Sequence, residues 1–390
     1  MGFNVPKLGP LLRPARWITC QNVEGIRHDW SRDEIGEIYR MPFTELLYRA
    51  ASVHRHNFNP LEVQKCTLLS IKTGGCSEDC KYCAQSSRYQ TAVDTQPMMS
   101  VDEVVKAAKR AKAAGSTRFC MGAGWRELGN KRAFADIKTM VTEVNAMGLE
   151  VCCTLGMLTE EQAKELKAAG LSAYNHNLDT SREHYPNVIS TRTYEDRLST
   201  IRNVRAAGIS VCCGGILGLG ESEDDRIGLL HELATMAEHP ESVPINALVP
   251  IKGTPLGKTE APDVFQMTRT IATARVIMPR SMVRLSAGRM SFSPLEQAVM
   301  FMAGANSVFS GDKLLTTPNP AFNEDALLFE GLQMKGRPAF AADTTPSSVT
   351  LASDELVNEK VDRDLREVFN DANDGFAVPN AHQEIPQGFQ

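Results

Sequence analysis

The chain has 390 residues, 42% of them hydrophobic, and its 42 Lys and Arg against 47 Asp and Glu give a formal net charge of −5. This acidic balance argues against a partner that is a nucleic acid, and no apolar run approaches the ~20 residues that a membrane-spanning helix needs. A chain of this length can bury a large core without disulfides, and it shows no secretory signal. Its ten cysteines therefore indicate a reducing compartment, for which we expect the cytoplasm, and a bound metal.

The two ends of the chain differ in composition from its middle. The first 23 residues contain Lys7, Arg13 and Arg16 and no acid, which is weakly typical of an organellar transit peptide, but they also contain three prolines and no serine. We therefore predict a disordered leader and assign residues 1–40 to this leader and an N-terminal helical extension. Residues 341–390 are acidic and poor in large apolar side chains, so we predict a disordered C-terminal tail or a loosely docked helix near its centre.

Three cysteines, Cys76, Cys80 and Cys83, form a C-x₃-C-x₂-C pattern just after a short apolar stretch. A loop of eight residues can wrap three thiolates around one cubane iron–sulfur cluster, which leaves one iron open to a small molecule because a closed site takes four cysteines. A structural zinc site is the alternative, but zinc prefers paired C-x₂-C units and a fourth ligand. The nearby His54 and His56 precede the loop by about one strand length.

Between the two ends, short apolar or β-branched runs alternate with stretches of helical period. Such repetition predicts a parallel sheet, and eight repeats predict a closed (β/α)₈ TIM-type barrel in residues 41–340. The expected strands are residues 67–73, 117–122, 149–155, 173–179, 209–217, 243–249, 282–287 and 307–310. Helices are expected at residues 101–114, 159–169, 194–207, 225–237 and 294–303, several of them followed by glycine.

Strand parity predicts which side chains face the lumen of this barrel, because successive residues point to opposite faces. If the polar set faces inward, Cys153 and Cys213 point outward to the helices. A single cysteine on a strand is usually a small buried apolar residue. Several converging cysteines are different, because three thiolates and one further group could hold a second, smaller cluster. The side chains predicted to face inward include Arg118, Cys120, Cys152, Cys212 and Arg284.

The cysteine loop, with Tyr82 before its last cysteine, resembles that of the radical S-adenosylmethionine (SAM) superfamily. Further segments resemble one branch of it, the biotin synthase family, over roughly residues 53–320. They are residues 68–83, 115–122, 174–180, 214–221, 243–246, 283–289 and 314–320. The resemblance implies a [4Fe–4S] cluster held by Cys76, Cys80 and Cys83, with SAM on its open iron. It also implies an inner [2Fe–2S] cluster held by three cysteines and an arginine, which correspond to Cys120, Cys152, Cys212 and Arg284.

The implied activity is that of a radical SAM sulfurtransferase. Dethiobiotin, a sulfur donor and two SAM would give biotin, two methionines and two 5′-deoxyadenosines, because an unactivated C–H bond needs a carbon radical to abstract its hydrogen. A bridging sulfide of the inner cluster is the implied sulfur source, and the cofactors carry the difficult step while the protein positions and shields. The family also implies a flavodoxin- or ferredoxin-type electron donor, iron–sulfur assembly proteins and a homodimer.

The resemblance assigns ligand contacts to polar residues in these segments. Asn177 and Asp179 would bind the ribose of SAM, and Asn177 with Asn246 would bind dethiobiotin. Thr316 and Thr317 would bind the dethiobiotin carboxylate. Two other interpretations stay open, since lumen polar groups can satisfy one another and threonines can cap a loop.

Other positions match motifs of the superfamily. Arg197 resembles the partner of the SAM carboxylate, although an arginine in such a helical stretch is more often a solvated charge. Ile216 would back the adenine in the glycine-rich segment that ends at Glu221, a weak signal by itself. Lys72 would help to neutralise an anionic site, and we interpret His176 as a packing residue.

Two other functions remain open. A different radical SAM enzyme, such as a hydrogenase-maturation or mutase relative, would share the barrel and the cysteine loop. It would not be expected to carry Cys120, Cys152, Cys212 and Arg284 together. A non-enzymatic iron–sulfur or zinc scaffold would have no use for the asparagines and threonines assigned to ligands.

Overall fold

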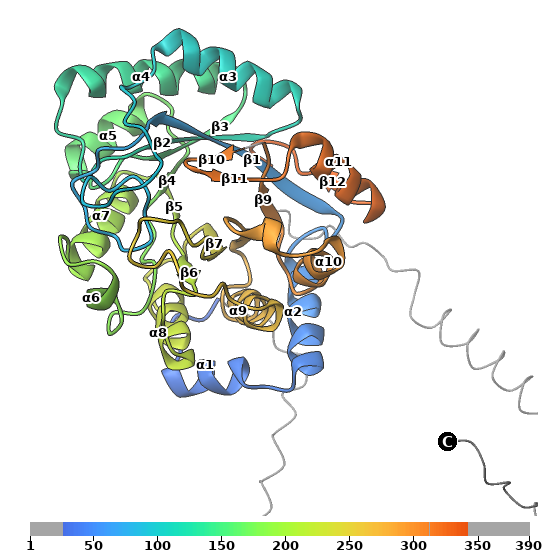
Figure 1. Cartoon of the computed structure of the whole chain (residues 1–390). Helices are drawn as coiled ribbons and strands as arrows, with labels where there is room; N and C mark the ends of the chain where they lie inside the picture. Colours follow the sequence, from blue (N-terminus) through green and yellow to red (C-terminus); the bar gives the residue numbers. More distant parts are fainter. Residues whose placement is uncertain (1–25, 312, 342–390) are drawn as a thin grey trace, which may run out of the picture. The chain divides into compact units, whose positions relative to one another are not determined.

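The structure, a computed structural model, describes residues 26–311 and 313–341. Of the predicted leader and N-terminal extension, residues 1–25 lie outside the described residues, and so does the predicted C-terminal tail from residue 342 on. Within the described part, a parallel β-barrel is surrounded by helices (Figure 1). The predicted (β/α)₈ barrel is therefore confirmed.

In the described residues, eight parallel strand positions close the barrel. The order is β1-β2-β3-β4-β5-β7-β8-β9, and β9 pairs with β1 to close the ring. The short strand β6 follows β5 at the same position in the barrel and pairs with β7. The barrel strands are β1 (Glu62–Lys72), β2 (Arg118–Ala123), β3 (Glu150–Thr154), β4 (Ala173–Asn175), β5 (Ser210–Cys212), β6 (Gly215–Leu217), β7 (Ser242–Ala247), β8 (Met282–Leu285) and β9 (Ser307–Phe309).

The first strand begins earlier than predicted. It was expected from residue 67, but β1 starts at Glu62. Its first residues pair with β12 (Lys335–Gly336), and the next three pair with β9. The cause is tertiary, because these partners lie more than 200 residues away in the sequence. As a result Cys66 is a strand residue.

Two later strands are shorter or broken. The strand expected at residues 209–217 is broken at Gly214. An added Cβ there would lie 2.0 Å from the Pro244 carbonyl oxygen, so only glycine fits against β7. The strand expected at residues 173–179 ends at Asn175. Asp179 then adopts a left-handed backbone with φ 69° and forms a single bridge with Gly215. Both breaks lie beside the polar residues assigned to ligands.

The helices form a ring outside the strands (Figure 1). The five predicted helices are present as α3, α5, α7, α8 and α10, and several begin with a capping box such as that of Ser100 and Glu103. The described helices are α1 (Arg32–Tyr39), α2 (Phe43–Asn57), α3 (Val101–Ala113), α4 (Lys131–Ala146), α5 (Glu160–Ala168), α6 (Tyr185–Val188), α7 (Tyr194–Ala206), α8 (Glu223–Ala234), α9 (Val264–Ile277), α10 (Pro294–Met302) and α11 (Phe322–Gly331), with a 3₁₀ turn at Arg289–Ser291.

The N-terminal helices α1 and α2 pack on the ring. Helix α2 lies along α9, and α1 contacts α8 and α9. Ile35 and Leu46 are fully buried there, and burying a side chain of this size contributes roughly 1.5–3 kcal/mol. Arg269 donates to the Met41 carbonyl oxygen at 2.7 Å. These contacts fix the extension to the barrel.

Two separate apolar clusters confirm the predicted strand parity. The larger cluster lies between strands and helices and contains Cys153 and Cys213. A smaller cluster contains Cys66, Cys120 and Cys152 with Ala173. Cys120 and Cys152 therefore face the lumen, as predicted, and their neighbours in the sequence face the helices.

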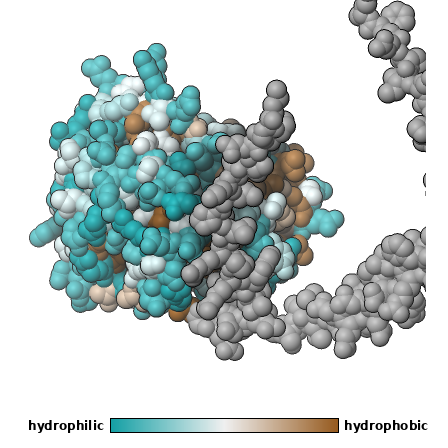
Figure 2. Space-filling view, turned by 90° about the horizontal axis from the view of Figure 1, so that it is seen from below, coloured by the Kyte–Doolittle hydropathy of each residue, from teal (hydrophilic) through white to brown (hydrophobic). Residues whose placement is uncertain are grey.

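The face of the molecule that is seen from below is mostly hydrophilic where described residues are drawn (Figure 2). Figure 2 views the side of α1 and α2 and shows scattered hydrophobic areas in a polar surface. Among the helices that the structure describes, none has the length and apolarity that crossing a membrane requires.

Candidate functional site

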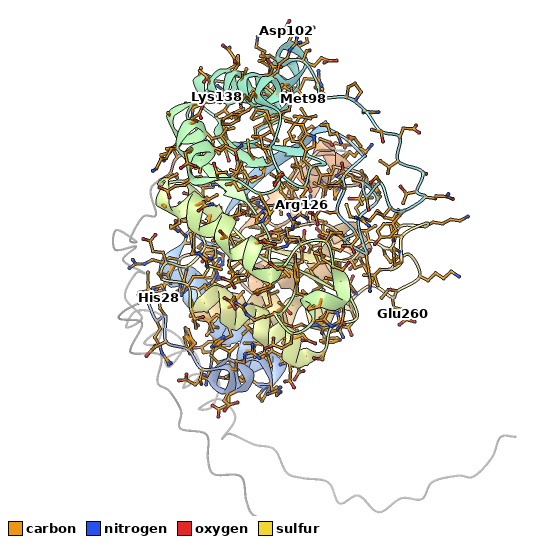
Figure 3. The ribbon with its side chains drawn as sticks, turned by 90° about the vertical axis from the view of Figure 1, so that its left-hand side faces the viewer. His28, Met98, Asp102, Arg126, Lys138 and Glu260 are labelled. Atoms are coloured by element: carbon orange, nitrogen blue, oxygen red, sulfur yellow. The ribbon has the colours of Figure 1, made fainter. Side chains whose placement is uncertain are left out.

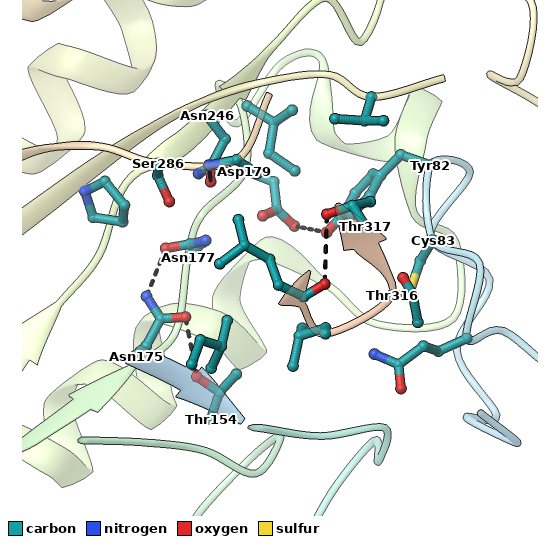
Figure 4. A pocket seen from close by; sticks show the side chains of 18 of the residues that line it. Tyr82, Cys83, Thr154, Asn175, Asn177, Asp179, Asn246, Ser286, Thr316 and Thr317 are labelled. Carbon is teal, nitrogen blue, oxygen red and sulfur yellow. Dashed lines mark hydrogen bonds between the residues drawn. The ribbon is translucent and has the colours of Figure 1, made fainter. Parts of the chain in front are cut away.

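A cavity of about 300 Å³ opens at the end of the barrel to which the strands run, where TIM-barrel active sites lie. It brings together most of the predicted site residues (Figure 4). Cys76, Cys80 and Cys212 are not among its lining residues. The predicted residues that line it are Tyr82, Cys83, Cys120, Cys152, Asn177, Asp179, Arg197, Ile216, Asn246, Arg284, Thr316 and Thr317.

The cysteine loop is held in shape by its own backbone. Cys83 N donates to the Cys80 carbonyl oxygen, and Cys76 N donates to the Gln85 carbonyl oxygen, both at 2.9 Å. The Gln85 side chain accepts from Gly74 N at 3.0 Å. Lys72 Nζ donates to the carbonyl oxygen of Gly74, and therefore supports the start of this loop. These hydrogen bonds set the conformation of the loop.

Two acidic residues inside the loop tie it to the segment before α7. Glu78 is buried and pairs with Arg126 at 2.7 Å, and Arg126 lies near the middle of the side view in Figure 3. Asp79 accepts from Ser190 N at 2.9 Å and from Thr191 N at 3.1 Å. Despite partial burial, these hydrogen bonds lower the pKa of Asp79 to about 2. Sequence reasoning missed this anchor, because its partners lie 48 residues from Glu78 and more than 100 residues from Asp79.

The three loop thiols are buried or half-buried and remain protonated in the absence of a cation. Burial raises the pKa of Cys80 to about 12 and that of Cys83 to about 11, and burial also raises the pKa of Cys76. The negative charge that a neighbouring loop cysteine carries when it ionises also raises the pKa of Cys80 and of Cys83. A bound metal would supply the missing positive charge and release the protons.

Within the described residues, no group of three His, Cys, Asp or Glu is arranged to hold a single metal ion. A cubane cluster binds each thiolate at a different iron, so its cysteines stand farther apart than the ligands of one ion. The nine cysteines in the described part of the chain are all free. This donor set fits a cluster better than a tetrahedral zinc ion.

Asp179 is the centre of a buried polar group beside the loop. It is 2% exposed and accepts from Tyr82 Oη at 2.9 Å and from Arg197 Nη2 at 2.6 Å. Arg197 also donates to Tyr185 Oη at 2.9 Å and to the Asn177 carbonyl oxygen. Arg197 is therefore a buried residue and not a solvated helix charge.

A second arginine, which sequence reasoning missed, lines the same cavity. Arg192 is 8% exposed, and its Nε is buried without a hydrogen-bond partner among the described residues. His176 is buried nearby, and burial followed by the charges of Arg197 and Arg192 lowers the pKa of its imidazole well below the usual value. The cavity wall thus carries positive charge from arginines and a neutral histidine.

Asparagines line the wall between the cluster loop and the lumen. Asn175 Nδ2 donates to Asn177 Oδ1 at 3.0 Å, and Asn177 Oδ1 also accepts from Gly214 N at 3.2 Å. Across the cavity, Asn246 Nδ2 donates to the Gly215 carbonyl oxygen at 2.8 Å. These residues therefore partly satisfy one another, and they still line the cavity (Figure 4).

The glycine-rich segment is shaped by Glu221. Its carboxylate accepts from Gly218 N at 3.0 Å and from Arg226 Nε at 2.8 Å. Ile216 pairs in register with Asn246 and lines the cavity. Glu221 thus holds the turn that follows β6, while Ile216 faces the ligand space.

Thr316 and Thr317 belong to a hairpin over the mouth of the barrel. Strands β10 (Lys313–Leu314) and β11 (Thr317–Pro318) pair there, next to β1. Thr317 Oγ1 donates to the Leu314 carbonyl oxygen at 3.5 Å, a long contact (Figure 4). Both threonines line the cavity, so their hydroxyl groups are close to any ligand in it.

The deepest part of the lumen holds the inner thiols. Cys120 and Cys152 are register partners on β2 and β3. Arg284 Nη1 donates to Cys212 Sγ at 3.6 Å, and its Nη2 donates to Cys66 Sγ at 3.4 Å. Four thiols therefore surround one arginine, whereas the sequence predicted three.

The thiols at this depth differ in pKa. Burial opposes ionisation of Cys66, but its hydrogen bond with Cys120 and the charges of Arg284 and Arg118 lower the pKa of Cys66 to about 6. The hydrogen bonds of Cys120 to Cys152 and to Cys66 raise its pKa well above the usual value. Cys120 therefore keeps its proton while its two neighbours ionise more readily.

A polar floor closes the lumen below the thiols. Arg118 pairs with Glu150 at 2.7 Å, and Gln64 Nε2 donates to the same carboxylate at 3.1 Å. Arg284 Nε donates to Ser307 Oγ at 2.9 Å. The floor fixes the orientation of both arginines toward the thiols.

Comparison with family models divides the chain into two matched parts. Residues 70–233 match the Radical SAM superfamily. Residues 244–335 match the Biotin and Thiamin Synthesis associated domain. The cysteine loop lies in the first part, and Asn246, Arg284 and the threonine hairpin lie in the second.

Among solved structures, methylornithine synthase is similar, with a TM-score of 0.66 at 18% identity over 79% of this chain and 94% of that chain. The hydrogenase maturase HydG from Carboxydothermus hydrogenoformans has a TM-score of 0.70 at 15% identity over 82% of this chain and 79% of that chain. At these identities the likeness concerns the fold alone.

Sequence relatives are much closer. The chain is 61% identical to "Biotin synthase, mitochondrial" of Arabidopsis thaliana over 83% of this chain and 86% of that protein. It is 59% identical to "Biotin synthase" of Cytophaga hutchinsonii over 82% of this chain and 95% of that protein. Identity to "Biotin synthase" of Schizosaccharomyces pombe is 57% over 82% and 89%. With this identity over most of both sequences, the chain belongs to the biotin synthase family of the radical SAM superfamily.

Proposed function

We propose that this chain is a biotin synthase that inserts sulfur into dethiobiotin and consumes two SAM for each biotin formed. The observation that carries the proposal is one cavity with Cys83 at its mouth, Cys120 and Cys152 at its depth, and hydrogen-bonding side chains between them. Membership of the family supports the same activity. A radical formed at the mouth and a sulfur source at depth would face the same substrate.

Cys76, Cys80 and Cys83 would hold the [4Fe–4S] cluster. When bound, this cluster and SAM supply the electron transfer that yields a 5′-deoxyadenosyl radical. The chain contributes the loop that carries the three thiols, anchored through Glu78 and Asp79. These hydrogen bonds would hold the thiols in place around the cluster.

We assign SAM to the wall formed by Asn177, Asp179 and Ile216. Asp179 is an acceptor suited to a ribose diol, and Tyr82 and Arg197 hold its carboxylate in place. Arg197 and Arg192 are the two buried cations for the SAM carboxylate, since charged hydrogen bonds of this kind are strong. Ile216 offers an apolar contact for the adenine.

Dethiobiotin would lie between this wall and the lumen. Asn177 and Asn246 present amide groups that suit a ureido ring, and Thr316 and Thr317 present hydroxyl donors that suit a carboxylate. The hairpin of the threonines covers the mouth of the barrel. It would therefore keep water from the substrate while also binding its charged end.

We propose that Cys120, Cys152, Cys212 and Arg284 hold the inner [2Fe–2S] cluster and that this cluster is the sulfur source. The donor set supports this, because converging thiols with an adjacent arginine lie in an otherwise closed lumen. The Arg118–Glu150 pair lies below them and fills the far end of the lumen with side chains. A substrate radical would then meet sulfur before it meets solvent.

The remaining proposals concern partners and location. A flavodoxin- or ferredoxin-type protein would supply electrons, and iron–sulfur assembly proteins would load the clusters. We propose a homodimer, which the mass of the purified chain in solution tests. We also propose a cytoplasmic location, although two relatives are named mitochondrial. Imaging of the tagged full chain tests this, and mitochondrial signal would contradict it.

The decisive experiment is anaerobic reconstitution of the purified chain with iron and sulfide, followed by dethiobiotin, SAM and a reductant. We expect biotin and 5′-deoxyadenosine by mass spectrometry. Deoxyadenosine without biotin would contradict the substrate or the inner cluster. Neither product, with the outer cluster intact and SAM bound, would contradict the enzymatic proposal.

A further inference from the structure

Cys66 is a buried thiol in the lumen that has no place in the proposed ligand sets. It is fully buried on β1 and belongs to the same apolar cluster as Cys120 and Cys152. Its sulfur is 3.4 Å from Arg284 Nη2 and 3.6 Å from Gln64 Oε1. It also lies 3.8 Å from Ser307 Oγ. Cys66 therefore has polar contacts on several sides.

The arginine lies between two sulfurs. Arg284 Nη1 contacts Cys212 at 3.6 Å, while Nη2 contacts Cys66. Cys66 and Cys212 therefore contact the same guanidinium, each through a different nitrogen. By contrast, Cys153 is equally buried but faces the helices, so a thiol's burial alone does not bring it to this site.

We propose that Cys66 is a reserve ligand of the inner cluster site, able to bind iron in place of Arg284. The proposal rests on the inner cluster assigned under the proposed function. Thiolate sulfur is the usual ligand of such clusters, whereas a guanidinium is a donor without an acceptor site. Around Arg284 the lumen thus offers four thiols, those of Cys66, Cys120, Cys152 and Cys212, which is the complete set for a [2Fe–2S] cluster.

The exchange balances without an added reactant. In such an exchange Cys66 would bind iron as a thiolate and Arg284 would leave as a guanidinium, so the proton that the thiol gives up would be the one that the arginine takes. The 3.4 Å contact between Cys66 Sγ and Arg284 Nη2 is the direct route for the proton. No electron is transferred. The chain can therefore keep an iron bound while Arg284 is detached from it.

The test compares the reconstituted full chain with C66S, R284A and C66S/R284A. Mössbauer spectroscopy counts the [2Fe–2S] cluster separately from the [4Fe–4S] cluster, which serves as the check on folding. We expect each single variant to retain the inner cluster and the double variant to bind it about tenfold or more weakly, since loss of an outer-shell partner alone already weakens metal binding by about 10–100-fold. C153S/R284A is the matched control and should behave as R284A.

A second readout separates ligation from packing. Nitrogen in place of thiolate raises the reduction potential of such a cluster, so the inner cluster of R284A should have a lower potential than that of C66S. Equal loss of cluster in R284A and in the double variant would overturn the proposal, as would full retention in the double variant. A wild-type chain with no [2Fe–2S] signal would instead contradict the inner cluster itself, and the reserve ligand with it.

Discussion

Cys120 and Cys152 lie directly opposite each other on β2 and β3, and both thiols face the barrel lumen. The next residue on β3, Cys153, faces the helices. Replacing both lumen thiols in C120S/C152S should abolish the inner cluster, because Cys66 and Cys212 are then the only thiols left beside Arg284. Deoxyadenosine should still form, whereas biotin should not. Mass spectrometry and iron counting measure both effects. C153S/C213S is the control, and loss of the inner cluster there as well would refute the assignment by parity.

The hairpin threonine is testable through substrate affinity. T317V removes a hydroxyl that would bind the dethiobiotin carboxylate, and hydrogen bonds to charged groups contribute about 1.5–3 kcal/mol. We expect KM for dethiobiotin to rise by about tenfold or more, since ~1.4 kcal/mol is tenfold, with KM for SAM unchanged. T139V on α4, far along the ring, should change neither constant. A loop-capping role would instead appear as lower thermal stability with KM for dethiobiotin unaltered.

The anchor of the cysteine loop should respond to acid. The pKa of Asp79 is lowered from 3.8 to about 2, so its hydrogen bonds add stability above pH ~4 that is lost as the pH falls through ~2. D79N should remove this part of the pH dependence. The free energy of unfolding of both chains, measured between pH 2 and 6, checks it. Parallel curves for the two chains would contradict the anchor.

The floor of the lumen contains a buried ion pair. E150Q leaves the Arg118 charge without its partner, and breaking such a pair costs about 3–5 kcal/mol. R118M/E150L removes both charges and should be destabilised less than E150Q alone. Chemical denaturation of the single and double variants measures the difference. A double variant that is less stable than E150Q would show that the pair itself stabilises the fold.

The strand break at Gly214 should not tolerate a side chain. G214A places a methyl group 2.0 Å from the Pro244 carbonyl oxygen, and overpacking of this kind costs about 1–3 kcal/mol. Gly129 has nothing within 4 Å of an added Cβ, so G129A is the matched control. Thermal unfolding compares the two. Equal melting temperatures would contradict the close approach of β6 and β7.

The barrel and the inward cysteines could be predicted because they depend on local periodicity. Alternation with period two decides between Cys152 and Cys153 without any tertiary information, and the structure agrees. Cys66 was missed because the predicted strand began one residue after it. The pairing of residues 62–66 with β9 and β12 extends that strand, and no local pattern reports partners so far away.

The same limit applies to the site. The loop pattern identified Cys76, Cys80 and Cys83, but Glu78 and Asp79 look like ordinary surface acids in the sequence. Their roles arise from Arg126 and Thr191, which only the fold brings near. The burial of Arg197 was likewise not visible, since its helix has polar residues on several faces.

The segment after α11 supports the barrel at the end opposite the proposed substrate site. Lys335–Gly336 pair with the start of β1, and Phe340 N donates to Glu150 at 2.8 Å. Glu150 in turn holds Arg118 beneath the thiols. A chain cut before this segment would keep its cysteines and its cavity, yet Glu150 would lose its hydrogen bond from Phe340. The stability of the proposed inner cluster would then depend on residues that contact neither SAM nor dethiobiotin.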